Sequence, residues 1–268
     1  MSKIRITDIA KKYRRGERLT MLTAYDATIA RLVDEAGVDM ILVGDSLGMV
    51  VQGHESTIPV TLDEVIYHTR CASRGASRAL VVADLPFMSY QASTTQAMLA
   101  AGRAMKEGAA GAVKLEGGLE MAKAVSLMTA AGIPVMAHIG LRPQRIHAMG
   151  GYKIQGRTAE DASLLVEEAR SFERAGAFSL VLEGVAMETA KEITGSVGIP
   201  TIGIGCGPHC AGQVLVIYDM LGLNPTFSPT FLKVYADGHS VINSAVKDYI
   251  EDVRAGRFPT ESHGFKRR

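Results

Sequence analysis

Three acidic residues each follow a short apolar run, at positions where α/β proteins place their chemistry. The runs are MILV before Gly44 and Asp45, LVVA before Asp84, and AVKL before Glu116. Short apolar runs of this kind are typical of strands buried on both faces of a parallel sheet. The carboxyl ends of such strands form the usual active-site edge of the fold. Asp45, Asp84 and Glu116 are therefore candidate members of one site.

If these strands are neighbours, their ends lie about 4.8 Å apart and the three carboxylates point at one region. Carboxylates gathered in this way repel one another and raise one another's pKa, which a divalent cation would relieve. Ligand sets made only of oxygen favour Mg²⁺ over zinc. The alternative is that each acid caps the following helix or pairs with a lysine. Three acids on consecutive strands favour the metal site.

Three further residues share these strand ends. Lys114 lies two residues before Glu116 and so faces the same side of its strand. A buried lysine needs an anionic partner, which is either a substrate carboxylate or, as a structural ion pair, Asp84. Glu183 closes a strand that we expect across the barrel from the third strand, which suits a general base. For His138, inside VMAHIG, a satisfied core position is favoured over a catalytic one.

Strands and helices alternate along the chain at intervals of roughly 20 to 40 residues, which implies parallel strands with right-handed crossovers. We expect strands at 20–25, 40–43, 79–84, 112–117, 135–140, 180–184, 201–207 and 214–217. The last of these, in GQVLVIYDM, also reads as a buried helical turn. A chain of 268 residues with this pattern favours a single-domain (β/α)₈ barrel over 1–268, with a short N-terminal helix. A doubly wound sheet is the alternative, but no G-x-G-x-x-G opens a helix after the first strand.

The segments between these strands carry helix signals. We expect helices at 7–13, 27–36, 62–74, 94–105, 119–131, 158–175 and 186–193. Thr7, Thr61 and Ser93 are the expected caps of three of them. The segment 48–60 contains glycine and proline and is expected to form a loop. Residues 231–256 are expected to be helical with a break at Gly238.

Composition limits the classes of function. Lys and Arg number 29 against 28 Asp and Glu, so the chain offers no basic surplus for nucleic acid or an anionic membrane. No apolar run approaches the ~20 residues of a membrane span, and the N-terminus lacks the pattern of a secretory signal. Three cysteines fit a reducing compartment. Cys206, His209 and Cys210 lack a fourth ligand at zinc-like spacing. We expect a cytoplasmic protein.

A set of motifs in order resembles the ketopantoate hydroxymethyltransferase family. The motifs cover almost the whole chain and are MLTAYDATIARLVDEAGVDMILVGDSLGMVVQGHESTIPVTLDEVIYHTR, VVADLPFMSY, AVKLEGG, AHIGLRPQ, GGYKIQG, GIGCG, GQVLVIYDMLGL and DVRAGRFP. The resemblance implies a (β/α)₈ barrel that uses Mg²⁺ and 5,10-methylenetetrahydrofolate. It also implies transfer of a hydroxymethyl group to 3-methyl-2-oxobutanoate through a Mg-stabilised enolate, in pantothenate biosynthesis. A homo-oligomer, commonly a homodecamer, is implied as well.

The resemblance also assigns roles to individual residues. Asp45, Asp84 and Glu116 match the family's metal positions, and Glu183 matches its proton acceptor. Asp45, Ser46, Asp84 and Lys114 match its contacts with the keto acid, and His138 matches a histidine that lines its site. Two positions depart from the family pattern: Cys206 and Ala211 stand where an alanine and an aspartate are usual. These changes are expected to affect loop contacts and folate affinity rather than the chemistry.

Two other functions compete with this one. The first is another Mg²⁺-dependent 2-oxo-acid enzyme, a lyase or mutase of the isocitrate lyase or phosphoenolpyruvate mutase type. The cysteine-bearing catalytic loop usual in those enzymes has no counterpart here. The second is a non-catalytic metal-binding barrel, which the intact set of acids, lysine and base argues against.

Overall fold

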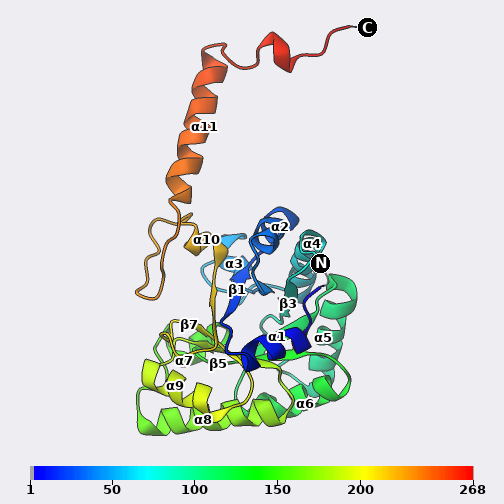
Figure 1. Ribbon diagram of the computed structural model, residues 1–268, viewed down its shortest axis with the longest axis vertical. Coiled ribbons are helices and arrows are strands. Elements are labelled where there is room, and N and C mark those ends of the chain that lie inside the picture. Colours follow the sequence, from blue (N-terminus) through cyan, green and yellow to red (C-terminus); the bar gives the residue numbers. More distant parts are fainter. Residues whose placement is uncertain (1–2, 268) are drawn as a thin grey trace. The chain divides into compact units, whose positions relative to one another are not determined.

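The computed structural model describes residues 3–267 and divides the chain into two compact units, residues 1–216 and 217–268 (Figure 1). Unit 1 contains a closed barrel of eight parallel strands in the order of the sequence, β1 to β8. The expected (β/α)₈ barrel is confirmed, and the doubly wound alternative is wrong. The expectation of one domain over 1–268 stays a prediction, since the barrel is complete within unit 1.

The strands are short and the helices lie outside them (Figure 1). The strands are β1 (Leu19–Thr23), β2 (Met40–Val43), β3 (Leu80–Asp84), β4 (Ala112–Glu116), β5 (Val135–Gly140), β6 (Ser179–Glu183), β7 (Thr201–Ile204) and β8 (Gly212–Leu215). The helices of unit 1 are α1 (Ile6–Arg14), α2 (Ala27–Glu35), α3 (Leu47–Val50), α4 (Leu62–Gly75), α5 (Thr94–Gly108), α6 (Ala122–Ala130), α7 (Ile146–Met149), α8 (Ala159–Arg174) and α9 (Met187–Ser196). The 3₁₀ turns η1 (Leu119–Met121) and η2 (Pro143–Arg145) precede α6 and α7.

Alternate residues of each strand point into the barrel, and their character changes along the strand. At the amino end the interior is apolar, with Met40, Leu80, Ala112 and Met136 in one buried cluster. Two or four residues further along, the same faces carry charged and polar groups. The register sets Asp84 beside Lys114, Glu116 beside His138, and Gly140 beside Glu183. The period of two along the strands therefore builds an apolar floor under a polar layer.

Helix α1 closes the amino end of the barrel. Ile9 is fully buried and belongs to the same interior cluster as the first residues of several strands. Basic residues at and after the end of α1 are partly paired within the chain: Lys12 Nζ lies 2.5 Å from Asp39 Oδ1, and Arg15 Nε lies 2.6 Å from Glu17 Oε1. The polar layer is consequently reached from the carboxyl ends of the strands.

Unit 2 contains α10 (Ile217–Met220), α11 (Gly238–Arg254) and the turn η3 (Glu261–His263). Helix α11 begins at Gly238, where Asp237 Oδ1 accepts a hydrogen bond from Ser240 N at 3.1 Å. Within residues 3–267, no helix combines the length and apolarity needed to cross a membrane.

Several expected boundaries are confirmed and others are wrong. Thr61 and Ser93 cap α4 and α5 as expected, each accepting a hydrogen bond from the backbone N–H three residues later. Thr7 lies inside α1 rather than at its start, where the Asp8 carboxylate accepts from Arg5 N instead. The segment 48–60 was expected to be a loop throughout, but residues 48–50 belong to α3.

The last strand and the last helix also begin elsewhere than expected. Strand β8 runs from Gly212 rather than over 214–217, because Gly212 pairs with Leu19 of β1 at a distance that leaves no room for a side chain. Residues Ile217–Met220 form α10, so the helical interpretation of that part was correct. Residues 231–237 are not helical. Tyr235 N donates outside the segment, to Met220 O at 2.9 Å.

A buried carboxylate joins α2 to the start of β3. Asp34 accepts hydrogen bonds from Ser77 N and Oγ at 2.9 Å, Arg78 N at 3.0 Å and Ala79 N at 2.5 Å. Burial by itself would raise the pKa of Asp34, but the hydrogen bonds from these donors together lower it below 3.8. The segment that leads into β3, and hence to Asp84, is held by this one side chain.

We predict that Asp34→Ala lowers the free energy of unfolding by about 3 kcal/mol, because it leaves several buried donors without an acceptor. Since the folded-state pKa is lowered, the stabilisation by Asp34 is fully present above pH 3.8 and is lost as the pH falls below that value. Denaturant unfolding at neutral pH and at low pH measures both effects. Glu35→Ala, at the exposed neighbouring position, is the control. Equal stability of the two variants at neutral pH would contradict the prediction.

Candidate active site

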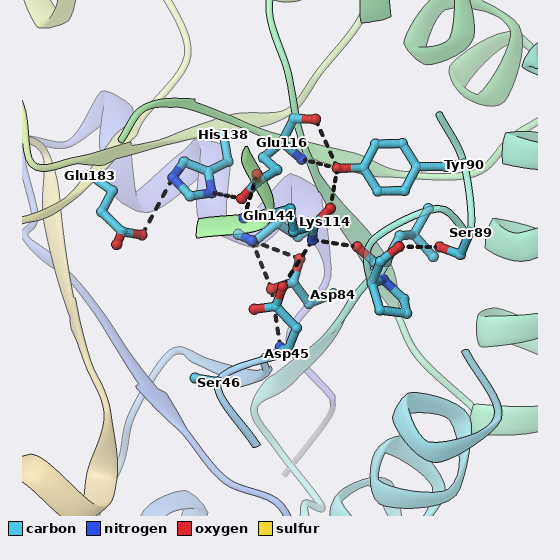
Figure 2. A network of polar contacts seen from close by, with 12 residues as sticks. Asp45, Ser46, Asp84, Ser89, Tyr90, Lys114, Glu116, His138, Gln144 and Glu183 are labelled. Atoms are coloured by element: carbon cyan, nitrogen blue, oxygen red, sulfur yellow. Dashed lines mark hydrogen bonds and ion pairs between the residues drawn. The ribbon is translucent and has the colours of Figure 1, made fainter. Parts of the chain in front are cut away.

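The polar layer at the carboxyl end of the barrel brings together six of the candidate residues (Figure 2). At its centre, Lys114 Nζ lies 2.6 Å from Asp84 Oδ1 and 2.7 Å from Asp84 Oδ2. Both side chains are almost fully buried. Of the two partners considered for Lys114, the structure contains the ion pair with Asp84.

Asp45 and Glu116 flank this ion pair, and both contact Gln144 of η2 (Figure 2). Gln144 Nε2 donates to Asp45 Oδ2 at 2.9 Å, and Gln144 N donates to Glu116 Oε1 at 3.0 Å. Asp45 N also lies 3.4 Å from Asp84 Oδ2. The expected convergence of the acids from three neighbouring strands is therefore present, with Asp45 immediately beyond the end of β2.

The His138 ring lies between two glutamates. Its Nδ1 is 3.7 Å from Glu116 Oε2, and its Nε2 is 3.4 Å from Glu183 Oε2. Neither nitrogen has a hydrogen-bond partner among the described residues. His138 was predicted to be a core residue whose ring nitrogens have hydrogen-bond partners, and this prediction is wrong. Glu183 was expected across the barrel from β3. This is wrong, because in the closed strand order β6, which carries Glu183, lies opposite β2. The His138 ring connects Glu183 with Glu116 through these two contacts.

Ser46 lies beside Asp45 but outside this network (Figure 2). Its hydroxyl is 2.9 Å from the Tyr25 hydroxyl, and Tyr25 is buried under the start of α3. The Ser46 side chain thus stands next to the cluster without contacting its charged groups through a hydrogen bond.

Burial and mutual repulsion change the acid–base properties of the central pair. Burial alone would lower the pKa of Lys114, but the charges of Asp84, Asp45 and Glu116 together raise it, so the ammonium keeps its proton. Burial raises the pKa of Asp84 to about 7 against the opposing charge of Lys114, and the charge of Asp45 adds to the rise. The single positive charge of Lys114 therefore does not offset the negative charge of the acids around it.

The outer residues of the cluster respond in the same way. Burial raises the pKa of Glu116 well above its ordinary value, and it raises that of Glu183 to about 8, with Asp45 and Asp84 contributing. Burial lowers the pKa of His138 well below 6.5, assisted by the charges of Lys114 and Arg142, so the ring is neutral. The Glu183 side chain is 26% exposed, whereas His138 is 1% exposed, so Glu183 is the group that a ligand can reach.

The donor chemistry of this cluster fits a hard divalent cation. Four carboxyl groups surround a single ammonium, and the pKa values of three of them are raised. An added cation with a preference for oxygen would relieve this repulsion. Within residues 3–267, no three His, Cys, Asp or Glu side chains already stand as a preassembled metal-binding group. The assignment of Asp45, Asp84 and Glu116 as metal ligands stays a prediction.

Sequence reasoning missed Gln144 and Tyr90. Both are nearly inaccessible to solvent, at 2% and 1% exposure. Each occurs in a quoted motif, AHIGLRPQ and VVADLPFMSY, and follows a strand end within a few residues. That position was the available signal, but a loop glutamine or tyrosine is ordinarily exposed or part of the core. Only the folded chain brings them against the acids.

Cys206, one of the two unusual residues, supports the end of β6. Its thiol donates to Leu182 O at 3.0 Å and accepts from Val185 N at 3.3 Å, on either side of Glu183. Burial raises the pKa of this thiol to about 12, so it stays protonated and keeps its donor. Cys206 therefore contacts the backbone on both sides of Glu183, and its expected effect on loop contacts stays a prediction.

Comparison with known proteins places this geometry in context. Residues 3–261 match the family described as ketopantoate hydroxymethyltransferase. The 3-methyl-2-oxobutanoate hydroxymethyltransferase of Geobacter metallireducens is 54% identical over 97% of each chain. That of Pelobacter propionicus is 54% identical over 98% of this chain and 97% of its own.

Solved structures with the same fold are more distant in sequence. Phosphonopyruvate hydrolase is 13% identical with a TM-score of 0.63, over 99% of this chain and 92% of its own. A structure of phosphonopyruvate hydrolase in complex with oxalate and Mg²⁺ gives a TM-score of 0.61 at 13% identity, over 94% of this chain and 88% of its own. The 2,3-dimethylmalate lyase, a member of the PEP mutase/isocitrate lyase superfamily, has a TM-score of 0.58 at 16% identity, over 94% and 98%. At this identity the likeness concerns the fold alone.

The raised pKa of Glu183 predicts a pH dependence of stability in the metal-free protein. Its pKa is about 8 in the folded chain against 4.5 ordinarily, so between these values the folded state binds more protons than the unfolded state. Stability therefore falls as the pH rises through this interval, and Glu183→Gln should make the fall smaller. Thermal unfolding in the presence of a chelator, from about pH 5 to about pH 8, measures this effect. Glu192→Gln, at an exposed position, should behave as the wild type. An unchanged pH slope in Glu183→Gln would remove Glu183 from this account.

Proposed function

Because the chain belongs to the ketopantoate hydroxymethyltransferase family, we propose that it makes 2-dehydropantoate from 3-methyl-2-oxobutanoate, 5,10-methylenetetrahydrofolate and water, with Mg²⁺. The observation that carries the proposal is the buried cluster of Asp45, Asp84, Lys114 and Glu116, with the partly exposed Glu183 at its edge. The cluster has the excess of carboxylates that a cation requires and a separate carboxylate that a substrate can reach.

In this proposal Asp45, Asp84 and Glu116 would hold Mg²⁺, and the bound ion would supply Lewis acidity to the 2-oxo acid. The family resemblance assigns the contacts with the keto acid to Asp45, Ser46, Asp84 and Lys114, and His138 lines the same site. Lys114 keeps its proton, so it neutralises negative charge on the keto acid and on the enolate oxygen. His138 is neutral and uncommitted to any hydrogen bond among the described residues, so it is available to a ligand.

Glu183 is the proposed general base. It takes the proton from C3 of 3-methyl-2-oxobutanoate, and the electrons of the C–H bond form the enolate. The enolate carbon then forms the new bond to the one-carbon unit that folate supplies, and tetrahydrofolate leaves. Water supplies the oxygen of the new hydroxyl group. A base whose pKa lies near the working pH combines a useful ionised fraction with useful basicity, and a value of about 8 meets this condition.

The 2-oxo-acid lyase alternative has no separate observation in its favour, because the likeness to those enzymes concerns the fold alone. A homodecamer, as the family resemblance implies, and a cytoplasmic location, as the composition predicts, complete the proposal.

Glu183→Gln tests the assignment of the base. The variant should bind Mg²⁺ and the keto acid nearly as well as the wild type, because the amide keeps the size of the side chain. It should lose exchange of the C3 hydrogen with solvent, together with at least about 100-fold in product formation, as expected when a general base is removed. NMR of the keto acid in D₂O, with and without 5,10-methylenetetrahydrofolate, follows both reactions. Exchange at the wild-type rate would remove Glu183 from this role, and product formation without folate would support the lyase type instead.

Asp45→Ala tests the metal site. Removing one of three carboxylates should weaken Mg²⁺ binding by at least about 10-fold, which calorimetry measures directly. Asp63→Ala is the matched control, since Asp63 is an exposed acid that pairs with Arg103 outside the barrel. Wild-type affinity in Asp45→Ala would exclude the shared site.

A further inference from the structure

Gln144 is the most completely bonded polar side chain in the site, and no role has yet been assigned to it. Its Nε2 donates to Asp45 Oδ2 and to Leu85 O, both at 2.9 Å. Its Oε1 lies 2.8 Å from the Tyr90 hydroxyl and accepts from Gln91 Nε2 at 2.9 Å. An amide has two N–H donors and two acceptor lone pairs, so these contacts use its full capacity.

The orientation of this amide is fixed by its partners. Reversing it would set Oε1 against a carboxylate oxygen and a carbonyl oxygen, neither of which can donate. Tyr90 holds the other end, because its hydroxyl also lies 2.9 Å from Glu116 O and accepts from Glu116 N at 3.2 Å. Burial and the charge of Glu116 raise the pKa of Tyr90 well above 10.0, so the hydroxyl remains a donor. The amide therefore cannot turn without breaking several buried contacts.

Gln144 contacts two acids that come from different strands. Its side chain holds Asp45, beyond β2, and its backbone N–H holds Glu116, at the end of β4. Asp84, on the strand between them, is held by Lys114. Gln144, although it lies in η2 after β5, thus sets where one oxygen of each outer acid lies.

The amide is also neutral, which matters for the charge of the cluster. A neutral amide adds no positive charge beside the acids, whereas a lysine in this place would add one. We propose that Gln144 is a positioning residue, which fixes where one oxygen of Asp45 and one oxygen of Glu116 lie and so keeps these acids apart for a bound Mg²⁺. This inference rests on the metal site of the proposed function.

Gln144→Met is the direct test. Methionine has about the same length, and the backbone N–H to Glu116 remains, so the change removes mainly the four contacts of the amide. Binding of Mg²⁺ alone, measured by calorimetry, should weaken by about 10- to 100-fold, which is typical for loss of a residue that orients metal ligands. The unfolding temperature in a chelator shows that the variant is folded. Ser179→Ala, which removes a buried hydrogen bond to Pro200 O at the other end of β6, should keep wild-type Mg²⁺ affinity.

Tyr90→Phe provides a second, milder test that remains informative if Gln144→Met fails to fold. Loss of the hydroxyl frees one side of the Gln144 amide, so Mg²⁺ binding should weaken, by less than in Gln144→Met. In the double variant, Tyr90→Phe should add little further loss, because both residues act through the same contact. Fully additive effects would mean that Tyr90 does not act through Gln144.

The outcomes separate this inference from the proposed function. Wild-type Mg²⁺ affinity in a folded Gln144→Met, with affinity lost in Asp45→Ala, would overturn the role of Gln144 and leave the metal site standing. Wild-type affinity in both variants would overturn the metal site itself. If Gln144→Met does not fold, wild-type affinity in Tyr90→Phe overturns the positioning role. Weakened affinity supports it when Gln91→Ala, which removes the other donor to Gln144 Oε1, weakens Mg²⁺ binding as well.

Discussion

The ion pair between Lys114 and Asp84 is the constraint on which the rest of the site depends. Two charges have been removed from water into the mouth of the barrel, and such a pair persists only if its geometry is good and its remaining groups are satisfied. Lys114 meets the first condition by contacting both oxygens of Asp84. The neighbouring acids Asp45 and Glu116 meet the second condition, because their charges also interact with the Lys114 ammonium. The repulsion among the acids themselves remains, and a bound metal ion would reduce it.

The framework of this site follows directly from the sequence, since it depends on local periodicity. Lys114 and Glu116 share a face because they are two residues apart on a strand. Asp45, Asp84 and Glu116 meet because consecutive strands are neighbours in the barrel. The fold is predictable from the same alternation of strands and helices. The errors fall where neighbours distant in the sequence decide, as at β8, whose start depends on the contact of Gly212 with β1.

The parts of the site that could not be predicted involve contacts between loops. Gln144 and Tyr90 lie in segments that sequence patterns treat as connections, and nothing local requires them to be buried. Their importance appears only when η2 packs against the loop after β3 and the amide finds four partners. His138 is a similar case: its place on β5 was predictable, but its position between Glu116 and Glu183 required the register of three strands.

The closure of the amino end by Ile9 determines the side from which a ligand reaches the polar layer. With that end filled by α1, the polar layer is open only at the carboxyl ends of the strands. Under the proposed function, substrates and products would therefore enter and leave the site at this one end of the barrel.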